Sequence, residues 1–284
     1  MSATLLLGKP VAEKLLAGLK KDIQKLDPKL VVVQVGNDPA SAIYIRQKFK
    51  ACEAVGMRSE HRHLPEKTTL KKLLDTIAEF NTDPDVTGFI VQVPLPSHLQ
   101  PQVPQVIRAI DPKKDVDGFG AYNLGKMFLS VEFEHLPPAT PAGVMEMLHF
   151  YCLPVAGKHA VVVGRSNIVG KPLAVMLINR GATVTVCHSQ TPDLTFFTSQ
   201  ADLLFTAVGK PKLITKEMVK PGAVVIDIGT TRTEKGLQGD VDFENVKEVA
   251  SSITPVPGGV GPLTVASLIR NCVTAKKRQM ENNG

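Results

Sequence analysis

The chain has 284 residues, of which 43% are hydrophobic, enough to bury a full core and typical of two domains of roughly 100–200 residues each. Its net charge of +6 is spread along the sequence with few interleaved aromatic residues, which argues against nucleic-acid binding and favours small anionic ligands. There is no apolar run of ~20 residues, and the N-terminal apolar run is too short for a signal peptide. We therefore expect no membrane association and a cytoplasmic location.

The first third of the chain predicts a helix, a strand and a second helix. Residues 10–26 have apolar positions at helical spacing with lysines on the opposite face. Residues 29–36 form a nearly continuous apolar run, which indicates a parallel strand covered on both faces. Asp38 is placed to cap the next helix, Pro39 to begin it, and Gly56 to end it.

Tyr44 and Lys48 lie four residues apart on this second helix and therefore share a face. That spacing is compatible with a functional pair. Spacing alone favours an exposed amphipathic helix on which Arg46, Lys48 and Lys50 are merely solvated, and it leaves the functional pair open as the alternative.

A helix over residues 68–80 and a strand over residues 86–93 continue an alternating pattern that predicts parallel strands with helical crossovers. Gln92 interrupts the apolar strand. Its amide must find hydrogen-bond partners, either within the structure or in a polar pocket. Because ligands of open α/β sheets gather at the carboxyl ends of strands, Gln92 is a candidate site residue.

The acidic loop at residues 111–118 carries Asp115 and Asp117, which could bind a cation, cap helices or accept from an amino-substituted heterocycle. Its D-x-D spacing lacks the remainder of a calcium-binding loop. The proline-rich segment 137–141 follows and is the expected domain junction, with Thr140 and Pro141 beginning a helix over residues 142–151.

The second half is organised around residues 159–172, a β-branched apolar run that breaks at Gly164 and restarts as a helix. A phosphate-binding loop of the NTPase type is excluded, because five residues separate Gly164 from Gly170 and Pro172 follows Lys171. The segment is closer to the dinucleotide fingerprint G-x-G-x-x-G, with Ser166 in place of the second glycine. By itself this variant is also compatible with a glycine turn that binds nothing.

The next expected strand, residues 182–187, ends where an NAD enzyme would place a carboxylate for the ribose hydroxyls. Here the chain reads His188-Ser189-Gln190 instead. With no acid at that position and Arg165 in the preceding loop, the segment predicts a pocket for a 2′-phosphate and hence NADP.

The remaining elements predict a second doubly wound sheet. A helix over residues 169–180 precedes strands at residues 183–187, 203–207 and 223–228, and the glycine-bearing strand ends at Gly209 and Thr230 are expected along the cofactor. Residues 253–264 alternate proline and glycine, which indicates a fixed backbone path near a ligand. A closing helix from residue 263 to about 279 is expected to pack back on the first domain.

Metal and disulfide chemistry have little support in the sequence. His61 and His63 alternate in an expected strand, and such a pair without a third ligand favours a surface position over a metal site. The cysteines lie far apart with no C-x-x-C pair, which argues against a zinc ribbon or disulfide framework and fits a reducing compartment; they are Cys52, Cys152, Cys187 and Cys272. No metal site is expected.

Five motifs, taken together and in this order, resemble the bifunctional methylenetetrahydrofolate dehydrogenase/methenyltetrahydrofolate cyclohydrolase family. They are Tyr44-Ile-Arg-Gln-Lys48, Val91-Gln-Val-Pro-Leu-Pro96, Lys114-Asp-Val-Asp-Gly118, Gly164-Arg-Ser-Asn-Ile-Val-Gly-Lys-Pro172 and Thr254-Pro-Val-Pro-Gly-Gly-Val-Gly-Pro262. The resemblance covers nearly the whole chain. It implies an α/β protein of two domains, usually a homodimer, with tetrahydrofolate derivatives as substrates.

The implied domains are a folate-binding α/β domain over residues 1–139, completed by the helix 263–284, and a Rossmann-type NADP-binding domain over residues 140–262. The resemblance also implies roles for individual residues. Lys48 would be the catalytic amine, Tyr44 would stack on the folate, Gln92 would tune Lys48 and Asp117 would accept from the pterin amino groups. The implied cofactor contacts are Gly164, Arg165, Ser166, Ser189, Gly209 and Thr230, with Arg165 and Ser189 at the 2′-phosphate. Further implied substrate contacts are Pro257, Gly258 and Gly261.

Two departures from the family pattern leave local contacts unassigned. The chain has Ala139 where many relatives have cysteine, so no thiol chemistry is assigned there, and it has Lys126-Met127 where relatives tend to have Arg-Leu. We expect NADP-dependent oxidation of methylenetetrahydrofolate followed by hydrolysis to formyltetrahydrofolate. The alternatives are an NADP-dependent dehydrogenase of another small substrate and a non-catalytic nucleotide-binding module.

Overall fold

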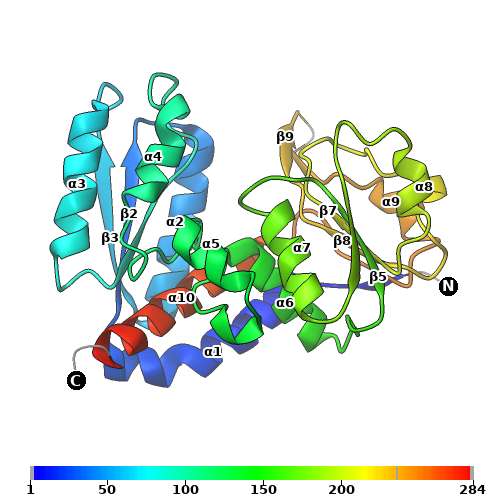
Figure 1. The fold of residues 1–284 in the computed structure, drawn as a ribbon, viewed down its shortest axis with the longest axis horizontal. Helices are drawn as coiled ribbons and strands as arrows, with labels where there is room; N and C mark the ends of the chain where they lie inside the picture. Colours follow the sequence, from blue (N-terminus) through cyan, green and yellow to red (C-terminus); the bar gives the residue numbers. More distant parts are fainter. Residues whose placement is uncertain (1–2, 235, 282–284) are drawn as a thin grey trace. The chain divides into compact units, whose positions relative to one another are not determined.

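The computed structural model of the protein describes residues 3–234 and 236–281, which form two compact units. The three-stranded unit consists of residues 14–126, 134–139 and the chain from residue 265 onward, and the six-stranded unit consists of residues 3–13, 127–133 and 140–264. Each unit is built on its own parallel sheet (Figure 1). The prediction of a two-domain α/β protein is confirmed.

The sheet of the three-stranded unit has the order β3-β2-β4, with β2 at Lys29–Val35, β3 at Arg58–Leu64 and β4 at Gly88–Val91. Both neighbours pair with β2 in parallel. The helices of this unit are α1 (Gly8–Leu26), α2 (Pro39–Val55), α3 (Leu70–Thr82), α4 (Val103–Arg108), α5 (Ala121–Met127) and α10 (Gly261–Glu281), of which α1, α5 and α10 also extend into the other unit.

The apolar run of β2 is buried on both sides because strand residues alternate between faces. Val31, Val33 and Val35 pack with apolar residues of α3 and α4. Leu30 and Val32 pack with α1, α2 and α10 on the other face. Figure 1 shows α10, drawn in red, running alongside α1, drawn in blue, and Lys277 of α10 forms an ion pair with Asp22 of α1 at 2.6 Å.

The sheet of the six-stranded unit has the order β1-β11-β8-β7-β5-β6, and every neighbouring pair is parallel. Its strands are β1 (Thr4–Leu5), β5 (His159–Val163), β6 (Thr183–Cys187), β7 (Leu203–Thr206), β8 (Val224–Asp227) and β11 (Ser252–Ile253). The order reverses at β5, which is the Rossmann-type doubly wound arrangement. The helices are α6 (Ala139–Phe150), α7 (Gly170–Asn179), α8 (Leu194–Thr198) and α9 (Phe243–Val246), and a hairpin joins β9 (Thr231–Thr233) to β10 (Gly236–Gln238).

The structure has the expected ends of α2 but not the expected start of α6. Asp38 caps α2 by accepting from the Ser41 backbone N–H, and Gly56 ends that helix in the left-handed conformation, as expected. The expectation that Thr140 and Pro141 begin a helix was wrong, because α6 already begins at Ala139. Its first turn is fixed by burial, since Ala139 and Ala142 are almost completely buried.

The six-stranded unit also takes residues that the sequence placed in the first domain. Thr4 and Leu5 of β1 pair with Ser252 and Ile253 of β11 and extend the larger sheet by one strand. Most boundaries between the units fall within helices, namely α1, α5, α6 and α10, and the one at residues 139–140 lies inside the segment 137–141 that was predicted as the junction. In the described residues, no helix is both long enough and apolar enough to span a membrane.

Asn271 ties α10 to two loops of the three-stranded unit, and its removal should destabilise that unit. Its buried amide nitrogen donates to the carbonyl oxygens of Val116 at 2.9 Å and Pro137 at 2.8 Å. In Asn271→Ala both acceptors lose their donor, so we expect a loss of about 2 kcal/mol in unfolding free energy, measured by urea denaturation. Met280→Ala, an exposed position on the same helix, should change it by less than ~0.5 kcal/mol. Equal stabilities of the two variants would contradict this role of Asn271.

Candidate active site and nucleotide-binding loops

Lys48 and Gln92 meet at the carboxyl edge of the three-stranded sheet. The chain leaves the central strand β2 toward β3 on one side and later returns to β4 on the other, so the loops after β2 and β4 diverge at this edge. Lys48 comes from α2, which follows β2, and Gln92 comes directly after β4. The Lys48 Nζ donates to the Gln92 Oε1 at 2.8 Å, and the Gln92 Nε2 donates to the carbonyl oxygen of Val93 at 2.7 Å.

The Gln92 amide is thus oriented by its own backbone and presents its oxygen to Lys48. The strand itself is anchored at this point, because the Gln92 backbone N–H donates to the carbonyl of Val33 in β2. The Gln92 amide therefore finds hydrogen-bond partners within the protein, and its bonds link the strand end to a lysine.

Burial lowers the pKa of Lys48, because a charged ammonium loses water when it is enclosed by protein, while the negative charge of Asp117 acts in the opposite direction. Burial also raises the pKa of Asp117 to about 6, opposed by the positive charge of Lys48 and assisted by Asp115. At neutral pH Asp117 is therefore mostly a carboxylate and a hydrogen-bond acceptor.

Asp115 and Asp117 have different roles. Asp115 forms a bridge with Phe89 that extends the sheet beside β4. Its carboxylate accepts from the backbone N–H groups of Gly118 and Gly120 and from the Asn123 amide, so it holds the loop in shape. Of the two carboxylates, Asp117 is the one whose charge interacts with Lys48.

The helix α2 presents two different faces. Arg46 and Lys50 are exposed, as the solvated-helix alternative requires, but Lys48 turns inward to Gln92. Tyr44 lies one turn before Lys48 and its side chain is 43% exposed. Ser41, a further turn back, is buried, and among the described residues nothing bonds its Oγ. Ser41 was not among the expected site residues, although its helical spacing from Tyr44 and Lys48 was a signal for it.

In the six-stranded unit, the loops after β5 and β7 meet where the strand order reverses. Gly164, at the end of β5, has φ +128°, and a Cβ atom there would lie 2.5 Å from the carbonyl oxygen of Ala207, after β7. A Cβ on Gly170 would lie 2.1 Å from the Gly164 carbonyl oxygen. Both positions therefore require glycine, and the backbone comes close at the point where nucleotide phosphates bind in such sheets.

Arg165 and the loop after β6 lie next to each other. The Arg165 guanidinium donates to the Gln190 Oε1 at 3.1 Å, and Arg165 and Ser189 are both exposed. The Ser166 Oγ accepts from the backbone N–H groups of Val169 and Gly170 and so fixes the start of α7. Arg165 supplies a cation and Ser189 a hydroxyl, and residues 188–190 include no carboxylate. This edge therefore fits a ribose that carries a phosphate.

Two buried carboxylates support the neighbouring loops, and the sequence pattern did not single out Asp240. Asp240 accepts from the backbone N–H groups of Val208 and Lys210 at 2.6 and 2.7 Å, which holds the exposed Gly209 between them. Asp227 accepts from the Thr206 hydroxyl and from the backbone N–H of Gly229, next to the exposed Thr230. Burial raises the pKa of Asp227 to about 6. Asp240 was not predicted because a single aspartate between β10 and α9 matches no sequence motif.

The proline- and glycine-rich segment after β11 is fixed by the same network. The Thr254 Oγ1 accepts from the Asp227 backbone N–H at 2.7 Å. Pro257 and Gly258 are exposed, and Gly261 is exposed at the first residue of α10. The bonds Val93–Pro94 and Val256–Pro257 are both cis.

The two histidines of β3 form hydrogen bonds with residues of β2 and of the loop that follows it. His61 hydrogen-bonds with the Gln34 Oε1 and His63 with the carbonyl oxygen of Gly36. Within residues 3–234 and 236–281, no three His, Cys, Asp or Glu side chains are grouped as metal ligands.

Two family models match the chain. The tetrahydrofolate dehydrogenase/cyclohydrolase catalytic domain matches residues 6–117, and the tetrahydrofolate dehydrogenase/cyclohydrolase NAD(P)-binding domain matches residues 138–280. The first contains the Lys48–Gln92 pair and the second contains the glycine loops of β5 and β7.

Curated relatives and solved structures agree with these matches. The bifunctional protein FolD of Oleidesulfovibrio alaskensis is 50% identical over 285 residues, covering 97% of this chain and 98% of the relative. The crystal structure of the bifunctional enzyme FolD, methylenetetrahydrofolate dehydrogenase/cyclohydrolase, from Campylobacter jejuni is 45% identical with a TM-score of 0.93, covering 98% of this chain and 100% of that one. The Trypanosoma brucei methylenetetrahydrofolate dehydrogenase-cyclohydrolase, solved with NADP and an inhibitor, is 35% identical with a TM-score of 0.93 and covers 99% of both chains.

These matches span both units, and each lies far above the similarity that a shared fold alone would give. The chain belongs to the tetrahydrofolate dehydrogenase/cyclohydrolase family.

Proposed function

We propose that the protein is a bifunctional enzyme of folate one-carbon metabolism. It oxidises methylenetetrahydrofolate to methenyltetrahydrofolate with NADP and then hydrolyses the methenyl product to formyltetrahydrofolate. The observation that carries this function is the 2.8 Å bond between the Lys48 Nζ and the Gln92 Oε1, beside the Asp117 carboxylate, in a chain that also has a Rossmann-type sheet. The direct test is to mix the purified protein with methylenetetrahydrofolate and NADP and to follow the absorbance of NADPH and of the methenyl product.

The oxidation requires alignment more than acid or base chemistry. Bound NADP would supply the acceptor for the hydride that leaves the methylene carbon. The protein's contribution is to hold the folate: Asp117 accepts from the pterin amino groups, and the Tyr44 ring stacks on the flat ring system. Pro257, Gly258 and Gly261 are further proposed substrate contacts, supported by their exposure on a loop that Thr254 and Asp227 hold in place.

The hydrolysis requires a base. Water attacks the methenyl carbon, a C–O bond forms, and one proton of the water passes to the Lys48 amine. The ring C–N bond then breaks as the proton of the remaining hydroxyl passes to the departing nitrogen, which leaves the formyl group. Lys48 can take that proton only when it is neutral, and its burial favours the neutral form. The positive charge of the methenyl substrate would favour it further.

Cofactor contacts are proposed for Gly164, Arg165, Ser166, Ser189, Gly209 and Thr230. The exclusion of any side chain at Gly164 supports close approach of a pyrophosphate to the backbone. The exposed Arg165 guanidinium and the Ser189 hydroxyl are proposed partners of the 2′-phosphate, which selects NADP over NAD.

The two alternative functions are disfavoured. A dehydrogenase of another small substrate is disfavoured because the folate-family catalytic model covers the unit that contains Lys48. A non-catalytic nucleotide-binding module is disfavoured for the same reason. In the proposed domain arrangement, the three-stranded unit binds folate and the six-stranded unit binds NADP. We also propose a homodimer, as the family resemblance implies, and a cytoplasmic location, which the four free cysteines support.

Replacing Arg165 should impair the use of NADP selectively. In Arg165→Ala the 2′-phosphate loses a charge-assisted hydrogen bond, so the KM for NADP should rise roughly 10- to 100-fold, while the KM for NAD should change less than about threefold. Initial rates of the oxidation with each cofactor measure both constants. Lys216→Ala, which removes an exposed cation from another part of the six-stranded unit, is the control. Equal losses with NADP and NAD would exclude Arg165 as the 2′-phosphate partner.

Replacing Lys48 should separate the two activities. Lys48→Met keeps most of the apolar stem and removes the amine, so hydrolysis should fall by ~10²–10⁴-fold while part of the oxidation remains. Both reactions are assayed on the same preparation, with folate binding measured separately. Lys50→Met, two residues on and exposed, should leave both rates near those of the wild type. Hydrolysis at the wild-type rate in Lys48→Met would mean that another group is the base.

A carboxylate in place of the Gln92 amide should shift the pH dependence of hydrolysis upward. In Gln92→Glu the negative charge next to the Lys48 Nζ stabilises the ammonium and raises the pKa of Lys48, so the neutral base appears only at higher pH. The rising limb of kcat/KM for hydrolysis, corrected for the spontaneous reaction, should therefore move to higher pH. Gln47→Glu, on an exposed position of α2, adds the same charge and should not move it. If the rising limb of Gln92→Glu stays at the same pH or moves to lower pH, Gln92 does not control the pKa of Lys48.

A further inference from the structure

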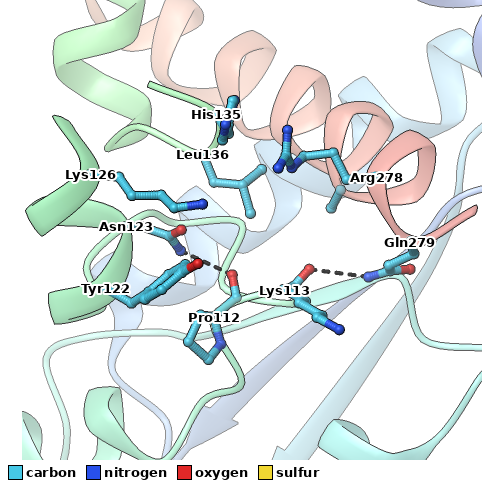
Figure 2. A pocket seen from close by; sticks show the side chains of 10 residues that line it. Pro112, Lys113, Tyr122, Asn123, Lys126, His135, Leu136, Arg278 and Gln279 are labelled. Carbon is cyan, nitrogen blue, oxygen red and sulfur yellow. Dashed lines mark hydrogen bonds between the residues drawn. The ribbon is translucent and has the colours of Figure 1, made fainter. Parts of the chain in front are cut away.

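A cationic hollow of about 200 Å³ lies within the three-stranded unit, and none of its lining residues is a proposed folate or NADP contact (Figure 2). Its walls come from four segments: the loop at Pro112 and Lys113, the helix α5, the residues before α6, and the end of α10. The lining residues are Pro112, Lys113, Tyr122, Asn123, Lys126, His135, Leu136, Ala275, Arg278 and Gln279.

The hollow lies toward the opposite edge of the sheet from Lys48. Its lining residue Gln279 donates through Nε2 to the carbonyl oxygen of Thr87, the residue before β4, whereas Gln92 follows β4. Five residue steps of a strand at about 3.3 Å each separate these two points by roughly 16 Å. The Gln279 end of the hollow is therefore well separated from the Lys48–Gln92 pair.

Positive charge converges on the hollow. Figure 2 shows the ends of Lys126 and Arg278 reaching toward its centre from opposite sides, with His135 above them. Burial lowers the pKa of His135, and the positive charges of Arg278 and Lys126 lower it further, which places all three groups within electrostatic reach of one another. None of the ten described residues that line the hollow is acidic, and the nearby Asp115 carboxylate accepts from the Asn123 amide.

The walls are fixed by hydrogen bonds that do not depend on a ligand. The Asn123 amide also donates to the carbonyl oxygen of Pro112 at 3.1 Å, and the Gln279 amide donates to that of Lys113 at 3.1 Å. The Lys126 Nζ lies 4.7 Å from the centre of the Tyr122 ring, which holds the ammonium over an aromatic face. Leu136 and Ala275 add buried apolar surface. The site is therefore largely preformed, with cations on two sides and an apolar wall.

We propose that this hollow binds a small organic anion, with its carboxylate or phosphate group between Lys126 and Arg278 and its carbon skeleton against Leu136 and Ala275. Arginine offers a planar fork that matches an oxyanion, and lysine adds a compact charge from the other side. The site is a second ligand site, independent of the proposed folate and NADP contacts.

Binding is tested by isothermal titration calorimetry at constant ionic strength with three probes: citrate for carboxylates, glycerol 3-phosphate for phosphate esters, and glycerol as the neutral control. The variant is Lys126→Gln/Arg278→Gln. Its matched control is Lys71→Gln/Lys277→Gln, which removes two cations from exposed ion pairs with Asp75 and Asp22 outside the hollow. Circular dichroism melting confirms that each protein is folded. Arg278→Lys, which keeps the charge and loses the fork, covers the case in which the double variant fails to fold.

We expect at least one of the two anions to bind the wild type and the matched control alike, and to bind the double variant at least tenfold more weakly. Arg278→Lys should weaken binding severalfold. Whichever anion binds identifies the acid group that the site accepts. The proposal is overturned if neither anion binds the wild type, if glycerol binds as well as they do, or if the double variant binds as tightly as the control.

Discussion

A lysine that is partly withdrawn from water must keep a hydrogen-bond partner, and this constraint organises the three-stranded unit. Lys48 satisfies it with the Gln92 Oε1 at 2.8 Å. The bond forms because α2 follows the carboxyl end of β2 and the neighbouring parallel strand β4 ends at the same edge. The order β3-β2-β4 places the two strand ends side by side. Gln92 can present its oxygen because its nitrogen is bonded to the carbonyl of Val93. The apolar packing on both faces of β2 then fixes the two ends that carry the pair.

In the six-stranded unit, buried carboxylates hold the loops in place. Its proposed nucleotide-binding loops consist of glycine-rich backbone, which has few side chains with which to hold itself in place. Asp240 and Asp227 replace those contacts by accepting from backbone N–H groups of the strand ends after β7 and β8. Burying two carboxylates so close together has a cost, seen in the raised pKa of Asp227, and several hydrogen bonds offset it. The two carboxylates that hold these loops are thus buried, away from the surface that a ligand would contact.

Local chemistry in the sequence predicted much of this arrangement. The unbroken apolar run of β2, the capping by Asp38 and Gly56, and the helical spacing of Tyr44 and Lys48 are short-range signals, and the structure has the corresponding strand, helix ends and shared face. Pairings between distant segments left no such signal. Thr4 and Leu5 join β11 through backbone bonds that any residue can make, and Asp240 reaches the Val208 loop across 32 positions of sequence. The start of α6 at the buried Ala139 lies before the capping residues from which it was predicted.

In the proposed function, Lys48 and Asp117 would allow a single site to serve two reactions. Burial pushes each group toward its neutral form, while the attraction between their charges pushes each toward its ionised form. The balance leaves Asp117 ionised at neutral pH, ready to accept from a bound heterocycle, and leaves Lys48 easier to deprotonate than an exposed lysine. A neutral methylene substrate changes this balance little, whereas the cationic methenyl product adds a positive charge that opposes the ammonium. In the proposed sequence of reactions, the oxidation therefore creates the charge that helps free the base needed for the hydrolysis.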